Sequence, residues 1–390
     1  WTSGNYNPGR GDLPFTLKTQ TGDGDYRVTE DDTIYFVYAT NDDRPQTVPT
    51  NSENIDINLF NYNANINSGN LYNAGFGFYA STAGEDGSSL YTGRFTNSNN
   101  DSPAGGQGLL QNIVKKNLRN GIPVLNTRNG ISMNSLFSSG DTSSKTSYTN
   151  LSGLFQLGAD GYYTYDSLLN GAVLDGNEIK VYDTIVTPDF ADYGNFLPFN
   201  SEWVNETYSG VPYKFSSRSE IDLWFGMNIG LNFYQPESGK INGEDMIFEF
   251  SGDDDVWVFI DGVLVLDLGG IHDRLNGTIN FSSGTVTAGS TTTTLRACYE
   301  AAYEELYPNA DEQEVQDYLN GIFDASGKFL NYSDHRLEFF YLERGGGAAN
   351  CRLRFNMPTL PNDGITVSKL IDNYDEGAYS DVEFQFEVGS

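Results

Sequence analysis

The chain is poor in the residues on which covalent links and catalysis depend. Its 390 residues include two cysteines, Cys298 and Cys351, and two histidines, His272 and His335. An extracellular setting would permit a disulfide between the cysteines, but two cysteines alone do not establish one, so their pairing stays open. For both histidines a hydrogen-bonded structural role is favoured over catalysis.

Familiar catalytic motifs are absent as well. The sequence lacks His-Glu-x-x-His, Gly-x-Ser-x-Gly, Cys-x-x-Cys and a phosphate-binding Gly-Lys-Ser/Thr loop. We therefore predict that the protein is not an enzyme. A glycosidase carboxylate pair stays open in principle, because such a pair is defined by its separation in space.

Positive charge is also scarce. The chain has 22 lysines and arginines against 53 acidic residues, which gives a formal net charge of −31. Such a surface repels nucleic acid and anionic membranes, so neither is expected as a partner. No apolar run reaches the 18 residues of a transmembrane helix, so membrane insertion is not predicted. The charge suits cation binding and a secreted or surface-exposed protein, although a well-solvated surface explains most of it.

Residues typical of strands and turns are abundant, with 43 Gly, 25 Tyr and 25 Phe. They predict an all-β fold with minor helical insertions. Alternating apolar residues predict strands at Ile55–Tyr62 and at residues 221–234, 246–250, 256–267, 336–343 and 351–356. Apolar residues at helical spacing predict helices within residues 107–120 and 298–323.

Three segments are expected along the chain. Residues 1–54 form an N-terminal β segment that can belong to the main domain, and residues 55–360 form the main β domain. Residues 361–390 form a linker followed by two strands. Two strands do not fold alone, so this last module is either cut or completed by residues outside the sequence.

The run from Asp253 to Asp255 is the most informative part of the sequence. It precedes two apolar runs that flank Asp261 and Gly262, a pair that favours a type I′ turn, so a buried hairpin is expected. Adjacent carboxylates repel one another and lose hydration on burial. Ca²⁺ would offset that cost, because it takes oxygen ligands. Alternatively, the acids cap backbone N–H groups of a turn.

Longer motifs in this region resemble the fibro-slime domain family of large surface proteins of Gram-positive bacteria. They are FEFSGDDDVWVFIDG at residues 248–262, DLGGIH at 267–272 and HRLEFFYLERGGG at 335–347, continuing to Asn350 and residues 354–356. The match covers about residues 221–356, and residues 55–220 fit more loosely. That family is similar in turn to the protective-antigen-like β-sandwich, whose sugar-binding members include yeast flocculins and epithelial adhesins. The resemblance implies this sandwich for the main domain.

In those lectins an Asp-Asp pair joined by a cis peptide and a second loop bind Ca²⁺, which contacts sugar hydroxyls. The resemblance places Asp253 and Asp254 on the pair. It places Glu343, with the backbone carbonyls of Gly345 and Gly347, on the second loop. The residues expected near the bound ligand are Asp255, His272, Asp273, Arg344 and Asn350.

Arg344 marks a departure from the lectins, which commonly carry Asn or Asp in place of Glu343-Arg344. Its guanidinium could occupy the cation site and form ion pairs with the acids without a metal. The sequence therefore leaves two alternatives at this position, a calcium site or a buried ion-pair network.

Residues 365–390 resemble the first strands of a collagen-adhesin B-type immunoglobulin-like repeat. Lys369 shares strand parity with Ile365, Val367 and Ile371, so its side chain is expected in the core of that module. In that family the corresponding lysine can form an isopeptide bond with an asparagine on a later strand. That strand lies outside the sequence, so Lys369 is expected to be unbonded.

The resemblance implies a bacterial cell-surface adhesin that uses Ca²⁺ to bind a host or environmental glycan or another host-surface ligand. It would be extracellular and part of a longer, cell-wall-anchored protein. One alternative is a non-catalytic tip or spacer module of a surface protein or pilus, in which calcium or ion pairs only stabilise the fold. A second alternative is an accessory domain of a carbohydrate-active enzyme.

Overall fold

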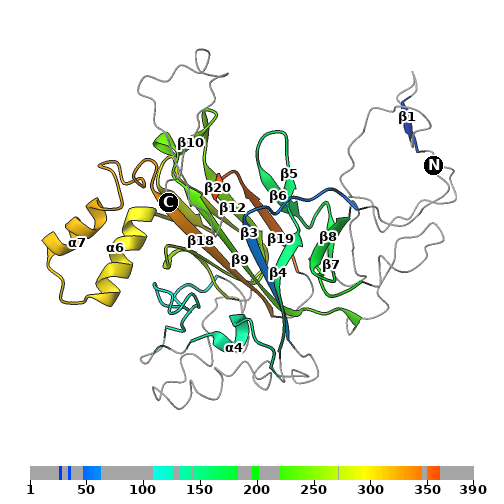
Figure 1. Ribbon diagram of the computed structural model, residues 1–390, viewed down its shortest axis with the longest axis horizontal. Helices are drawn as coiled ribbons and strands as arrows, with labels where there is room; N and C mark the ends of the chain where they lie inside the picture. Colours follow the sequence, from blue (N-terminus) through cyan, green and yellow to red (C-terminus); the bar gives the residue numbers. More distant parts are fainter. Residues whose placement is uncertain are drawn as a thin grey trace, which may run out of the picture.

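Two large β-sheets dominate the structure, a computed structural model (Figure 1). The residues that it describes are 26–28, 34–36, 47–62, 109–126, 130, 132–142, 145–182, 196–201, 220–270, 272–344 and 349–360. Helices in this part are few and short. The predicted all-β fold with minor helical insertions is therefore confirmed.

In the described part of the chain, the first sheet has seven strands and the second has nine. The first runs β17 (Thr291–Thr294), β16 (Thr285–Ala288), β15 (Leu275–Asn280), β12 (Ile247–Gly252), β19 (Cys351–Phe355), β6 (Tyr163–Asp166) and β5 (Gln156–Leu157). The second runs β14 (Val263–Leu268), β13 (Asp255–Ile260), β18 (Asp334–Arg344), β9 (Trp224–Tyr234), β3 (Ile55–Tyr62), β4 (Lys145–Gly153), β8 (Glu178–Tyr182) and β7 (Gly171–Asp175), and β20 (Thr359–Leu360) pairs with β9.

Smaller elements complete this part of the chain. Two short hairpins are formed by β1 (Tyr26–Val28) with β2 (Ile34–Phe36), and by β10 (Lys240–Ile241) with β11 (Glu244–Asp245). The helical elements are α4 (Asn134–Phe137), a 3₁₀ turn at Glu237–Gly239, α6 (Leu295–Leu306) and α7 (Glu312–Asn320). Among the described helices, none is long and apolar enough to cross a membrane.

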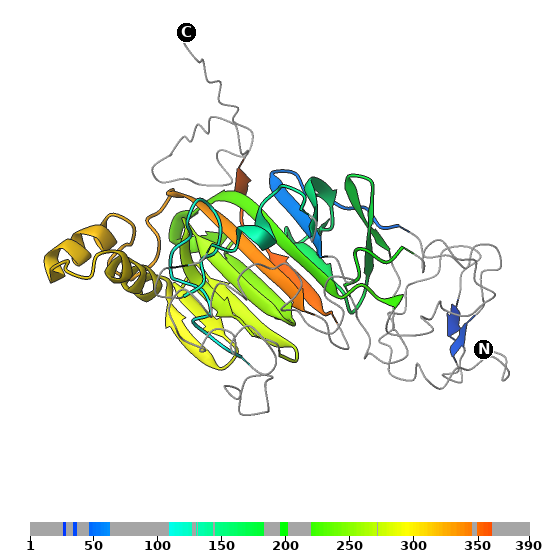
Figure 2. The same ribbon diagram turned by 90° about the horizontal axis from the view of Figure 1, so that it is seen from below.

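The two sheets face each other across an aromatic core (Figure 2). Phe250 of β12 lies 5.7 Å from Phe339 and 6.5 Å from Tyr341 of β18, measured between ring centroids. Alternation along β12 and β18 turns every second residue inward, which is how an antiparallel sheet buries one face. The architecture is a β-sandwich. Its kinship with the protective-antigen-like sandwich stays a prediction.

The β13–β14 hairpin forms as the sequence predicts. Asp261 and Gly262 both have positive φ, 52° and 80°, as a type I′ turn requires. All six residues of β13 are buried, with Val256, Val258 and Ile260 in the main core. The alternate residues Trp257 and Phe259 face outward into a second apolar cluster. The hairpin is therefore held on both faces.

The helix predicted within residues 107–120 is wrong. Residues 109–126 contain no helix and instead form isolated bridges, Val114 with Leu125 and Asn117 with Val263. Their apolar residues cover the outer face of the nine-stranded sheet, where Ile113 and Val114 join the cluster around Trp257. Burial on that face, not helical periodicity, explains their spacing, so tertiary packing overrode the local pattern.

The helix predicted within residues 298–323 is two helices. Thr294 caps α6 by accepting from the N–H of Ala297, and Pro308 prevents α6 from continuing past Leu306. Asp311 and Glu314 form a capping box at the start of α7. The prediction for residues 361–390, Lys369 included, lies outside the described residues, as does most of the segment 1–54.

Candidate functional site

Asp253 and Asp254 lie where the chain crosses from one sheet to the other. Strand β12 ends at Gly252 in the seven-stranded sheet, and β13 begins at Asp255 in the nine-stranded sheet. Gly252 is needed at this crossing, because a Cβ there would lie 2.1 Å from the carbonyl oxygen of Asn350. The Asp253–Asp254 peptide bond is cis. The predicted acid pair thus stands at an edge of the sandwich.

Asp253 is held by Asn350. The backbone N–H of Asn350 donates to Oδ1 of Asp253, and its Nδ2 donates to Oδ2 at 3.0 Å. The backbone N–H of Asp253 donates in turn to the carbonyl of Asn350 at 3.2 Å. Burial raises the pKa of Asp253, and the Asn350 donors, His272 and Arg274 lower it by smaller amounts. Asn350, predicted near the ligand, therefore contacts the acid pair directly.

The segment after β14 supplies donors to the next two acids. The backbone N–H of His272 donates to Oδ1 of Asp254 at 3.2 Å, and that of Gly270 donates to Oδ1 of Asp255 at 2.6 Å. Both acids are buried and make further contacts. Arg274 reaches the same region, donating to Oδ1 of Asn350 at 2.9 Å. Sequence reasoning did not single out Arg274, whose role depends on residues distant in sequence.

Glu343 lies at the same edge. Asp255 pairs with Leu342, so continuing that register by one step places Asp254 opposite Glu343. The hydroxyl of Tyr341 donates to Oε2 of Glu343 at 3.3 Å. Burial raises the pKa of Tyr341 well above its usual value, and the negative charges of Glu343, Asp253 and Asp254 raise it further. Tyr341 therefore contacts one of the predicted ligands and lies within electrostatic range of two more.

The side chains of His272 and Asp273, both predicted near the ligand, make no described hydrogen bond to Asp253 or Asp254. The ring of His272 is buried, with Nδ1 2.9 Å from the carbonyl oxygen of Asp273 and Nε2 3.0 Å from that of Leu268. Its backbone N–H, not its ring, contacts Asp254. Asp273 is exposed. His272 therefore has a structural role, in which its ring hydrogen-bonds to backbone carbonyls of the segment after β14.

The side chains near Asp253 and Asp254 can be compared with the oxygen ligands that a calcium site needs. Among the described residues, no three His, Cys, Asp or Glu side chains gather closely enough to hold a metal ion. A cation would therefore need amide and backbone oxygens beside the carboxylates, and Ca²⁺ accepts both. The side chain of Asn350 does not add a ligand oxygen, because its Nδ2 donates to Asp253 and its Oδ1 accepts from Arg274. Gly345, Gly347 and the side chain of Arg344 lie outside the described residues.

The two cysteines do not form a disulfide, which settles the pairing that the sequence left open. Cys351 is buried beside Asn350, and Cys298 lies on α6 with its Sγ 3.6 Å from the carbonyl oxygen of Val265. Burial raises the pKa of the Cys298 thiol to about 11 and raises that of Cys351 as well. Both thiols are therefore protonated at neutral pH.

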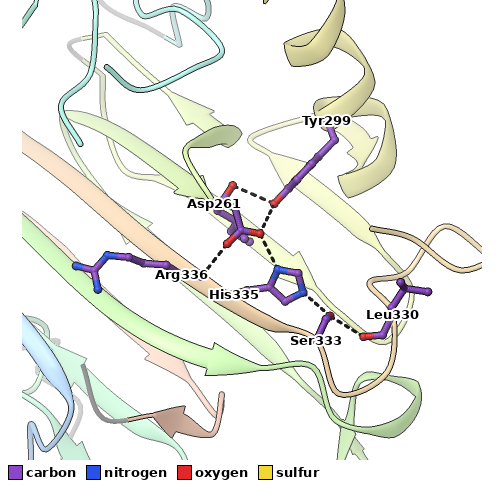
Figure 3. Close-up of polar contacts among 7 residues, drawn as sticks. Asp261, Tyr299, Leu330, Ser333, His335 and Arg336 are labelled. Atoms are coloured by element: carbon purple, nitrogen blue, oxygen red, sulfur yellow. Dashed lines mark hydrogen bonds and ion pairs between the residues drawn. The ribbon is translucent and has the colours of Figure 1, made fainter. Parts of the chain in front are cut away.

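A second polar network lies at the other end of β13, around Asp261 (Figure 3). Oδ2 of Asp261 is 2.7 Å from Nδ1 of His335, and Oδ1 accepts the backbone N–H of Arg336 at 2.9 Å. The hydroxyl of Tyr299 lies 3.1 Å from the same Oδ2 and 3.0 Å from the carbonyl oxygen of Ile260. Sequence reasoning treated Asp261 only as a turn residue and missed this network.

Ser333 extends the network beyond His335. Its Oγ lies 2.6 Å from Nε2 of His335 and 2.6 Å from the carbonyl oxygen of Leu330. The order Ser–His–Asp is that of an acyl-transfer relay, in which the serine gives its proton to the histidine. Here the single hydroxyl proton is donated to Leu330, so Ser333 accepts from His335. The arrangement joins a turn, a strand and a helix, and it lacks an activated serine.

The chain is similar in sequence to proteins of Dictyostelium discoideum. It is 26% identical to Protein psiF over 200 residues, which cover 50% of this chain and 23% of psiF. It is 31% identical to Protein psiP over 105 residues, which cover 25% of this chain and 14% of psiP. It is 38% identical to Protein psiO over 85 residues, which cover 20% of this chain and 11% of psiO. The matches thus span less than a quarter of these relatives. No family model and no solved structure matches the chain.

These relatives overturn the predicted function. The chain resembles proteins of a eukaryote, so the assignment to a Gram-positive bacterial adhesin anchored in a cell wall is wrong, and so is the calcium-dependent glycan binding inferred with it. The bacterial setting of the spacer and pilus alternative fails for the same reason. The motifs around Asp253 and Glu343 lie at an edge of the β-sandwich, and one fold can serve different functions, so they do not fix the function.

Proposed function

We propose that this chain is a non-enzymatic, extracellular β-sandwich module that binds Ca²⁺ at the edge containing Asp253 and Asp254. The concentration of buried carboxylates there carries the proposal. Asp253, Asp254, Asp255 and Glu343 expose 8%, 5%, 0% and 2% of their surface. Burying several carboxylates together is unfavourable unless positive charge accompanies them, and a divalent cation provides two charges at one point.

The carboxylate ligands would come from Asp253, Asp254 and Glu343. Because no three such side chains among the described residues gather closely enough to hold an ion alone, backbone carbonyls and water would complete the shell. Asn350 already orients the Asp253 carboxylate through two N–H donors, so this ligand is positioned in advance. Tyr341 does the same for Glu343. Ca²⁺ would contribute charge and would tie the β12–β13 crossing to the end of β18. The function of such a site is to stabilise the edge of the sandwich.

Three observations support a non-enzymatic, extracellular module. The serine of the Ser333–His335–Asp261 network donates its proton to a backbone carbonyl, so it is not set up as a nucleophile. The net charge of −31 suits a protein exposed to calcium-rich surroundings. The matched relatives are more than four times as long as their matched segments, which suits a module within larger proteins.

The melting temperature of metal-stripped protein tests the proposal. It is measured in chelator, in millimolar Ca²⁺ and in millimolar Mg²⁺. Binding to the folded state adds about 2.7 kcal/mol at a hundredfold excess over Kd. We expect Ca²⁺ to raise the melting temperature by about 3–5 °C in a domain of this size. Mg²⁺ should have less effect, because it demands octahedral geometry and keeps its waters.

The contrary outcome is equally informative. If Ca²⁺ leaves the melting temperature of the stripped protein unchanged, the calcium proposal fails. The acids would then be balanced within the protein, with Arg344 as the first residue to replace. An Arg344→Gln variant would lose stability in that case, whereas a calcium site would tolerate it or bind Ca²⁺ more tightly.

A further inference from the structure

Helices α6 and α7 form a hairpin that stands outside both sheets at one end of the sandwich (Figures 1 and 2). Its inner side is apolar and buried, through Leu295, Tyr299 and Ala302 of α6 and Val315 and Leu319 of α7. The core of the sandwich therefore holds the base of the hairpin and leaves its far side to solvent.

The end of α6 exposes large apolar and aromatic side chains. Leu306 and Tyr307 expose 56% and 54% of their surface. The ring of Tyr303 lies 4.7 Å from that of Tyr307 and stacks 4.3 Å from that of Tyr318 on α7. Single exposed apolar residues are common on protein surfaces, but here two neighbouring ones lie beside the half-buried rings of Tyr303 and Tyr318. We call Tyr303, Leu306, Tyr307 and Tyr318, with Glu304 and Glu305, the α6–α7 tip.

Negative charge surrounds this patch. Residues 295–320 contain seven acids and one base, and these charged residues are Arg296, Glu300, Glu304, Glu305, Asp311, Glu312, Glu314 and Asp317. Glu304 and Glu305 occupy the last turn of α6, which has no basic residue. The helix dipole and the terminal carbonyls favour a cation at that position. Glu305 already has two partners, since the Nζ of Lys115 lies 3.9 Å from it and the backbone N–H of Lys116 donates to its Oε2 at 3.4 Å.

The tip is anchored firmly. Tyr299 extends from α6 to the Asp261–His335 network, as Figure 3 shows, with its hydroxyl bonded at 3.0 and 3.1 Å. Its ring packs edge-on against Phe323 and Phe329 at 5.1 and 5.6 Å. A surface fixed in this way loses little conformational entropy when a partner binds.

We propose that the α6–α7 tip is a docking surface for an arginine- and lysine-rich segment of a partner protein. Charge complementarity selects this occupant. Guanidinium groups stack on tyrosine faces and pair with carboxylates, and Leu306 receives the aliphatic part of the same side chains. The acids of the tip repel nucleic acid and anionic lipid. The surface lies apart from Asp253 and Asp254 and does not depend on calcium.

Fluorescence anisotropy with fluorescein-labelled octa-arginine tests the proposal, at 50 and 300 mM NaCl. Leu306→Ala/Tyr307→Ala should weaken binding about tenfold, as expected for an aromatic anchor at an interface. The matched control is Leu157→Ala/Leu169→Ala, which removes two leucines of similar exposure, 48% and 53%, away from the tip. This control should stay within about twofold of the parent.

A second pair of variants separates local charge from the charge of the whole chain. Glu304→Gln/Glu305→Gln should weaken binding and flatten its salt dependence, whereas Glu178→Gln/Glu244→Gln, which removes two exposed acids elsewhere, should change neither. Octa-lysine should bind the parent more weakly than octa-arginine, because its ammonium groups do not stack. Tyr307→Leu should abolish that preference while keeping apolar surface.

Two results would overturn the proposal. The first is equal loss of binding in the tip and control variants, which would reduce it to general attraction toward an acidic protein. The second is self-association of the parent, seen by sedimentation and removed by Leu306→Ala/Tyr307→Ala, which would make the tip an interface between copies of this chain. Circular dichroism and melting temperatures of all variants verify that each one folds.

Discussion

The two ends of strand β13 carry carboxylates in very different surroundings. At the hairpin turn, the oxygens of Asp261 meet side-chain partners from α6 and β18, Tyr299 and His335, and the backbone N–H of Arg336. At the opposite end, Asp253, Asp254, Asp255 and Glu343 are buried at one edge, and the three aspartates accept chiefly from backbone N–H groups and the amide of Asn350.

This difference shows what distinguishes a structural carboxylate from a candidate cation ligand. Asp261 has partners built into the fold, and the network joins the hairpin turn to β18 and α6 (Figure 3). Around Asp253, burial raises the carboxyl pKa more than the nearby donors, His272 and Arg274 lower it. Asp253 is therefore expensive to ionise, so an added cation has more to contribute beside it than at the turn.

Breaking the turn network should have the largest effect in chelator. Asp261→Asn keeps the size of the side chain and tolerates the positive φ of 52°, but it loses the charge that His335 faces. We expect about 2–3 kcal/mol of lost unfolding free energy, measured by urea denaturation, because hydrogen bonds to charged groups are broken. The loss should be the same with Ca²⁺ and with chelator.

Asp160→Asn is the matched control for this change, because its side chain is 61% exposed and its contact with Arg354 is long, 3.9 Å. We expect it to stay within about 0.5 kcal/mol of the parent. A loss in Asp261→Asn that grows when Ca²⁺ is present would mean that the turn also responds to calcium, and the contrast between the two ends would fail.

Asp254→Ala should act mainly through calcium. In chelator it removes the acceptor of the His272 N–H, which costs about 1 kcal/mol. In millimolar Ca²⁺ it should cost about 2 kcal/mol more, because the binding free energy is lost as well. Melting curves in the two buffers measure the difference, with Glu178→Gln as an exposed control. Equal losses in both buffers would make Asp254 a cap for backbone N–H groups.

Local patterns in the sequence predicted the strands and the hairpin well. Ile55–Tyr62 is a strand with the predicted bounds, and Asp261 with Gly262 forms the expected turn. These features depend on alternation and turn chemistry over a few residues. Residues 107–120 failed because their apolar spacing is set by the sheet face that they cover, which no local pattern reveals.

The long-range parts of the sites were predicted less evenly. The motifs identified Asp253, Glu343 and Asn350, which do meet at one edge. The pairing of Asp261 with His335, 74 residues apart, was missed, because both residues look ordinary in their own segments. Arg274 escaped notice for the same reason. The motifs that predicted the edge did not reveal the function, since one fold can serve unrelated functions.

Asp267 tests the comparison in a third position, on β14 between the two ends of the hairpin. It accepts the backbone N–H groups of Asn112 at 2.7 Å and Gly269 at 3.2 Å. Burial nevertheless raises its pKa to about 6, those two donors lower it, and the charge of Asp255 raises it. At Asp267, as at Asp253, the hydrogen-bond donors lower the pKa by less than burial raises it.

The sign of the effect follows from the direction of this shift. An ordinary aspartate has a pKa near 3.9, so as pH rises from about 4 to about 6 the unfolded chain releases this proton before the folded one. Over that interval the free energy of unfolding of the parent should therefore fall by about 2 kcal/mol relative to that of Asp267→Asn. This effect is confined to that pH range. Urea denaturation of both proteins at pH 4 and 7.5 measures it, and the other acids cancel in the difference. A difference that does not change with pH would show that the Asn112 and Gly269 donors balance the charge of Asp267, and backbone donors would then suffice for the acids near Asp253 without a cation.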